Sequence, residues 1–68
     1  MLENLTLSNT ETRAWRLIAE GATNKEIAAV LKTTVGNILS NNYRLFKKLG
    51  VRNRTEAANL WRSNAYKA

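Results

Sequence analysis

The 68-residue chain contains no cysteine, no histidine and no proline. Without cysteine it can form neither a disulfide nor a thiolate metal site, and without histidine it lacks the commonest metal ligand and the usual general base. Five acidic residues remain, and the sequence does not bring any two of them into a plausible catalytic pair. We therefore expect no enzyme activity, no metal, no cofactor and no small-molecule ligand.

Long apolar runs are also missing from the chain. No stretch approaches the ~20 apolar residues that a membrane helix needs. The start of the chain lacks the basic flank and the apolar run of a signal peptide. We expect a cytoplasmic protein without membrane contact, folded as a single domain over residues 1–68 because so short a chain builds only one core.

Positive charge is abundant but unevenly placed, within a formal net charge of +6. Residues 1–34 carry four basic and four acidic side chains, whereas residues 35–68 carry seven basic side chains and one acidic one. A basic excess confined to one half of the chain is typical of a nucleic-acid-binding surface. A solvated surface that only aids solubility is the alternative interpretation of the charge alone.

Signals for helix ends recur at short intervals. Ser8 with Glu11, and Thr23 with Glu26, each have the spacing of a capping box, and Asn53 with Glu56 resembles one. Glycine commonly closes a helix, and glycines stand at positions 21 and 50. These signals predict helices over residues 9–20, 24–31, 35–49 and 54–65.

The predicted helices form an all-α, four-helix fold with a helix-turn-helix at its centre. The second and third helices are joined only by Lys32 and Thr33, with Thr34 as the next N-cap, and so short a link suits a steep crossing. Apolar residues at helical spacing predict the core. These residues are Ala14, Trp15, Ile18, Ala19, Ile27, Val30, Leu31, Ile38, Leu45, Leu49, Ala57, Ala58, Leu60 and Trp61.

Two segments carry a family resemblance, LIAEGATNKEIA at residues 17–28 and KKLGVRNRTEAA at residues 47–58. Together with Leu7, Ser8 and Glu11 they closely resemble the LuxR/FixJ/GerE-type helix-turn-helix domain, over residues 7 to about 62. The resemblance implies a DNA-binding domain of a bacterial or phage transcription regulator, either a stand-alone member of the family or a domain cut from a longer chain. It also implies that the third helix enters the major groove.

The same resemblance implies that the fourth helix forms a two-fold contact between copies. The residues expected at this dimer interface are Ala58, Trp61, Arg62 and Ala65. Trp61 has two possible roles, as an anchor of the core or as part of a partner surface, because little chain follows it to cover it.

With Ile38, Leu45 and Leu49 turned inward, the helical period turns another set of residues outward to read bases. This set is Val35, Leu39, Ser40, Asn42 and Tyr43. The resemblance singles out Leu39, Ser40 and Tyr43, although the family commonly has a polar residue at the position of Leu39. Leucine can specify a base only by apolar contact, such as with a thymine methyl group, so we expect an A·T-leaning readout.

A second set of residues is expected to bind phosphates. Its members stand at helix amino termini, which attract anions, or carry positive charge along the groove edge. They are Thr23, Asn24, Lys25, Thr34, Arg44, Lys47, Lys48 and Arg54. Contact with roughly five phosphates predicts a slope of about −4 to −5 for log affinity against log salt.

The function favoured by these patterns is sequence-specific binding of double-stranded DNA by a small transcription regulator, as a homodimer in the nucleoid. The alternative is a protein-interaction module that pairs with a larger LuxR-type regulator and modulates it. The apolar Leu39 in the reading set and the exposed position expected for Trp61 motivate that alternative. A basic RNA-associated peptide is disfavoured because stacking aromatics do not alternate with the basic residues.

Overall fold

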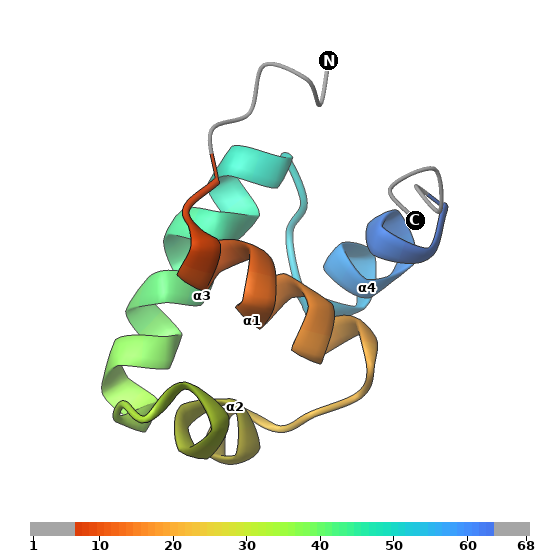
Figure 1. Ribbon diagram of the computed structural model, residues 1–68. Coiled ribbons are helices and arrows are strands. Elements are labelled where there is room, and N and C mark those ends of the chain that lie inside the picture. The colour runs from red at the N-terminus through yellow and green to blue at the C-terminus, as the bar shows by residue number, and fades with distance from the viewer. Residues whose placement is uncertain (1–6, 64–68) are drawn as a thin grey trace.

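The computed structural model describes residues 7–63, which form four α-helices and no strand. The helices are α1 (Asn9–Ala19), α2 (Asn24–Leu31), α3 (Val35–Leu49) and α4 (Arg54–Ser63). In Figure 1, α1 lies in the middle, with α3 on one side and α4 on the other, and α2 packs across one end of α3. The predicted all-α helix-turn-helix fold is confirmed.

The predicted bounds of the second and third helices are confirmed, and the end of the first helix needs a small correction. α1 ends at Ala19 because Glu20 serves as its C-cap. α4 is described as far as Ser63, so the last part of the predicted range 54–65 lies outside the described residues.

Local side-chain hydrogen bonds account for the helix starts. Both predicted capping boxes are present: the Ser8 hydroxyl accepts from the amide of Glu11, and the Glu11 carboxylate accepts from the amide of Ser8. Thr23 and Glu26 repeat the pattern at α2. These bonds satisfy amides that the helix itself leaves without a partner.

The start of α4 differs from a capping box. The Asn53 side chain accepts from the amide of Glu56, as expected. The Glu56 carboxylate, however, accepts from the amide and the guanidinium of Arg52. The reciprocal bond is therefore made one residue earlier than the sequence pattern predicts.

The turn between α2 and α3 contains an unusual backbone conformation. Lys32, the C-cap of α2, has a φ of 57°, in the left-handed region that favours glycine. The chain then reverses through Thr33, and the hydroxyl of Thr34 caps α3 by accepting from the amide of Asn37. This short turn sets the steep crossing of the helix-turn-helix.

The core forms where the inward faces of all four helices meet. Its buried apolar residues are Ala14, Trp15, Ile18, Ile27, Ala28, Ile38, Leu45, Leu49, Ala57 and Ala58. The prediction of a buried Val30 is wrong, because this side chain is 51% exposed and Ala28 is buried instead. Val30 lies roughly 110° around the helix from the middle of the face that α2 turns inward.

Trp15 joins α1 to α4, which is distant in sequence. Its indole N–H donates to the backbone carbonyl of Ala57 at 2.8 Å. Its ring meets that of Trp61 edge to face, with centroids 5.0 Å apart and planes at 80°. Trp15 is the predicted core anchor, whereas Trp61 is only partly buried at the edge of the core.

An ion pair joins α1 to α3. The Lys48 ammonium lies 2.9 Å from Oε1 of Glu11, a residue that is almost fully buried. The Lys48 ammonium, with the amide of Ser8, holds the pKa of the Glu11 carboxyl below its ordinary value. Glu11 therefore serves both as a cap of α1 and as the partner of Lys48.

A polar cluster, called here the Asn24 junction, joins α2, α3 and α4. Its members are Ala22, Asn24, Asn42 and Arg54. The Asn24 carboxamide oxygen accepts from Nδ2 of Asn42 at 3.2 Å and from the Arg54 guanidinium at 2.9 Å. Arg54 also donates to the carbonyl of Ala22. The junction therefore holds the start of α2 and the start of α4 against the middle of α3.

Replacing Glu11 by glutamine is expected to make stability less dependent on pH. Glutamine keeps the capping geometry but not the charge, so Glu11→Gln loses about 1 kcal/mol near neutral pH. Because the folded-state pKa of Glu11 is lowered, its contribution is complete above the ordinary value of 4.5 and is lost as pH falls through the lowered pKa. Urea unfolding from neutral pH to about pH 3 should show the gap between wild type and variant closing. A gap that stays constant over this range would contradict the role given to Glu11.

Replacing Arg54 by methionine tests the Asn24 junction. The variant keeps apolar bulk but leaves Asn24 and Ala22 without their charged donor, so it should lose about 1.5 kcal/mol and roughly 6–12 °C in Tm. Arg62→Met is the matched control, since Arg62 is exposed on the same helix and makes an exposed hydrogen bond to Asn59 within that helix. Equal melting temperatures for the two variants would show that the junction contributes nothing to stability.

Candidate nucleic-acid interface

The side of α3 that faces away from the core forms an exposed surface. This outer face of α3 consists of Val35, Leu39, Ser40, Tyr43 and Lys47. Leu39 is 54% exposed and Tyr43 is 64% exposed, although the opposite side of the same helix is packed into the core. The predicted outward position of these residues is confirmed, and their contact with bases stays a prediction.

Lys47 and Tyr43 form a pair on this face. The Lys47 ammonium lies 5.2 Å from the centre of the Tyr43 ring, within the range of a cation–π interaction. The contact holds a positive charge beside an exposed aromatic ring on successive turns of the helix. A surface of this kind combines apolar contact area with attraction for a polyanion.

The prediction that Asn42 points outward to read bases is wrong. Asn42 is only 6% exposed, and its amide nitrogen is spent on Asn24 in the Asn24 junction. The inward sector of α3 is wider than its aliphatic residues suggest, because Asn42 lies one turn after Ile38 on the same side. Asn42 is therefore a structural residue of the junction.

The flank of α3 beside α2 and α4 carries half of the predicted phosphate set. Lys25 is exposed at the start of α2, where first-turn amides and the helix dipole attract anions. The Thr23 hydroxyl, however, is occupied by capping, and the side chains of Asn24 and Arg54 are bonded to each other. Three of these four residues therefore have structural partners, and of these only the cap at Thr23 was predicted from the sequence.

Of the remaining members of the set, Arg44 and Lys48 lie on the opposite flank of α3, beside α1, whereas Lys47 belongs to the outer face and Thr34 stands at the start of the helix. Arg44 is exposed, as expected. Lys48 forms the ion pair with Glu11, which neutralises the charge that was predicted to meet a phosphate. The hydroxyl of Thr34 is used to cap α3. Of the predicted cations, Lys25, Arg44 and Lys47 are exposed and lie outside every ion pair found among residues 7–63.

The predicted dimer residues on α4 lie in different environments. Ala58 was predicted both for the core and for the dimer interface; it is buried in the core of the single chain, so the first prediction is confirmed and its place in the dimer set is wrong. Trp61 is partly covered by its contact with Trp15, and Arg62 is exposed. Ala65 lies outside the described residues. Of the predicted dimer residues, Arg62 and the partly buried Trp61 therefore lie outside the fully buried core.

Sequence reasoning missed the environment of Asn41. This residue is only 8% exposed, and its amide nitrogen has no hydrogen-bond partner in the described part of the chain. It lines a hollow of about 500 Å³ between α3, the first turn of α1 and the end of α2. The spacing of three and four residues from Ile38 and Leu45 is the signal that would have placed it inward.

Other kinds of site find no support between residues 7 and 63. No group of three or more metal-binding side chains gathers in this part of the chain. None of the four helices is long and apolar enough to cross a membrane.

Comparison with known proteins identifies a family that this chain resembles. The family model described as "Bacterial regulatory proteins, luxR family" matches residues 5–61. The response regulator Rre1 of Synechocystis sp. is 52% identical over 40 residues, or 59% of this chain. The chain spans 17% of the length of that relative. No solved structure matches the chain closely enough to count as a significant similarity.

The matched residues include the capping boxes, the turn, the whole of α3 and the Asn24 junction. The resemblance found in residues 17–28 and 47–58 is therefore confirmed over most of the chain. The chain belongs to the luxR family of bacterial regulatory proteins, a family of helix-turn-helix domains that bind DNA in transcription regulation.

Proposed function

We propose that this chain binds double-stranded DNA with α3 in the major groove and regulates transcription as a homodimer. The observation that carries the proposal is the outer face of α3, which is exposed, carries Lys47 and has the exposed Lys25 and Arg44 beside it, while the opposite face of the same helix is built into the core. A helix with its side chains is roughly 10–12 Å across, which matches a major groove about 12 Å wide. A location at the nucleoid in the cytoplasm follows from this proposal, and no enzyme activity is proposed.

Base reading is assigned to Leu39, Ser40 and Tyr43, with Val35 at the start of the helix. Leu39 offers only apolar contact, which fits a thymine methyl group, whereas the Ser40 hydroxyl can donate to or accept from any base. An asparagine in the groove can form two hydrogen bonds to adenine, but the amide of Asn42 is bonded to Asn24 and is excluded from the reading set. A preference for A·T pairs therefore rests on Leu39.

Phosphate binding is assigned to the exposed cations Lys25, Arg44 and Lys47 and to the amides at the start of α2. Arg54 adds charge from the Asn24 junction. Lys48 is left out because Glu11 already neutralises it. About four phosphate contacts follow, one fewer than the roughly five expected from the sequence.

A dimer through α4 supports useful specificity, because a single module of this kind buries only ~600–1,000 Å² on DNA. A two-fold contact places the same surface of α4 from each copy together. Arg62 and the uncovered edge of Trp61 are the residues on which we place this contact.

The second candidate function is modulation of a larger LuxR-type regulator by pairing with it. The exposure of Leu39 and Tyr43 on α3 favours a surface with apolar contacts. The basic cluster around them favours DNA instead, and DNA remains the first proposal. Failure to bind any duplex, with capture of a luxR-family protein, would reverse this order.

The salt dependence of DNA binding tests the phosphate assignment. Fluorescence anisotropy with a duplex of about 20 base pairs should give a slope of about −3.6 for log affinity against log salt. Lys47→Gln should reduce its magnitude by about 0.9. Arg13→Gln removes the same charge from the exposed side of α1 and should leave the slope unchanged. A slope near zero for the wild type would contradict DNA binding itself.

The dimer contact has its own test. Arg62→Glu reverses an exposed charge on α4, and a two-fold axis repeats the change on both copies. Cooperative binding of two copies to one duplex should be lost in Arg62→Glu and kept in Arg13→Glu, which makes the same charge change on α1. Sedimentation of the protein–DNA complexes would measure the stoichiometry. Equal cooperativity in the two variants would remove α4 from the interface.

A further inference from the structure

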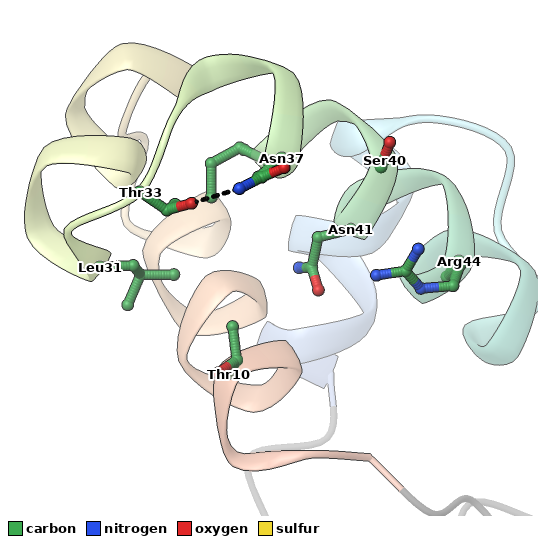
Figure 2. A pocket seen from close by; sticks show the side chains of 8 residues that line it. Thr10, Leu31, Thr33, Asn37, Ser40, Asn41 and Arg44 are labelled. Carbon is green, nitrogen blue, oxygen red and sulfur yellow. Dashed lines mark hydrogen bonds between the residues drawn. The ribbon is translucent and has the colours of Figure 1, made fainter.

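The hollow beside α3, called here the Arg44 hollow, lies on the flank of α3 opposite the Asn24 junction. Figure 2 shows it between α3, the first turn of α1 and the end of α2. The residues that matter here are Thr10, Leu31, Thr33, Asn41 and Arg44. Its volume of about 500 Å³ is ample for a phosphate group and its water.

The side-chain amide nitrogen of Asn41 is a buried hydrogen-bond donor in the hollow that has no acceptor among residues 7–63. In Figure 2 its side-chain amide stands in the middle of the hollow, with the nitrogen turned toward Leu31. The residue is more than nine-tenths buried, and this nitrogen has no hydrogen-bond partner within residues 7–63. A buried donor without an acceptor is costly, so such groups are rare unless a ligand completes them. The missing group is a hydrogen-bond acceptor.

The positive charge of Arg44 indicates that the acceptor is an anion. Its guanidinium extends toward the Asn41 amide from the next turn of α3 (Figure 2). No acidic residue lines the hollow, so the guanidinium has no carboxylate there to balance it. The hydroxyl of Thr10 can donate, and that of Thr33 keeps its own proton because it accepts from Asn37. These donors together fit an oxygen-rich anion, and a phosphate group above all.

The position of the hollow indicates where such a phosphate comes from. A helix that fills the major groove has one DNA strand along each of its flanks. The Asn24 junction flank has the start of α2 and Lys25 for one strand, whereas the other flank loses Lys48 to Glu11. Arg44 is then left as the exposed cation of the α1 flank, and it stands at the hollow.

We propose that the Arg44 hollow seats a backbone phosphate of the DNA strand that runs along the α1 flank of α3, with Asn41 and Arg44 as its donors. This inference rests on the proposed DNA binding and adds a specific phosphate site to it. Free inorganic phosphate is the other source of the same chemistry, and the experiment distinguishes the two.

Three variants test the site by DNA affinity. Arg44→Gln should reduce the magnitude of the salt slope by about 0.9. Asn41→Asp replaces the buried donor by a carboxylate of the same shape and should weaken binding by about tenfold. Arg13→Gln is the control and should match the wild type in both respects. If Arg44→Gln and Asn41→Asp both match the wild type while the wild type binds DNA with a steep salt slope, the phosphate site is wrong and the proposed function stands.

A measurement on the unaltered chain avoids any effect of Asn41→Asp on folding. In ¹⁵N-labelled wild type, the side-chain NH₂ signals of Asn41 should shift on addition of the duplex, and those of Asn42 should shift much less because that amide is already bonded. Inorganic phosphate at equal phosphate concentration should leave both unchanged. A shift with inorganic phosphate and none with the duplex would overturn the assignment to DNA. Unchanged Asn41 signals with bound duplex would overturn the site altogether.

Discussion

The carboxamide oxygen of Asn24 accepts hydrogen bonds from two other parts of the chain, and the geometry of the basic side of the molecule depends on it. Asn42 brings the middle of α3 to this oxygen, and Arg54 brings the start of α4. A charge-assisted bond in a partly buried setting is worth more than an exposed one. The exposed face of α3 is therefore held in a set orientation relative to the amino ends of two other helices.

This constraint divides α3 into sectors with different tasks. One sector is aliphatic core, and the outer face of α3 is free for bases. Between them lie two polar flanks, and each has a hollow: the one at the Asn24 junction is lined by Asn24, Asn42 and Arg54, which are bonded to one another, and the other is lined by Asn41 and Arg44. The two flanks differ in their buried donors: the amide nitrogen of Asn42 bonds to Asn24 across the interface with α2, although its Oδ1 has no partner among residues 7–63, whereas the amide nitrogen of Asn41 has no acceptor there.

The helices could be predicted closely from sequence because their ends depend on local signals. The capping pairs Ser8–Glu11 and Thr23–Glu26 form within four residues and need no tertiary information. The fate of polar side chains could not be predicted in the same way. Asn42 and Lys48 look like surface residues until Asn24 and Glu11 are brought to them by folding, over separations of 18 and 37 residues.

The difference between local signals and contacts formed only by folding also explains which site residues were predicted wrongly. Leu39, Ser40 and Tyr43 lie opposite the aliphatic stripe, so the helical period alone predicts their exposure. Ala58 was assigned to a dimer surface although it is buried in the core of the single chain. Small apolar residues on a terminal helix fit an internal or an external contact equally well, and only packing decides between them.

Backbone amide chemical shifts of the ¹⁵N-labelled chain, recorded with and without a DNA duplex, would show whether α3 is the helix that reads DNA. The largest changes are expected along the outer face of α3, at the start of α2 and around Arg44. The exposed sides of α1, around Arg13, should change little. Changes centred on α1, or on α4 alone, would contradict the assignment of α3 as the DNA-reading helix.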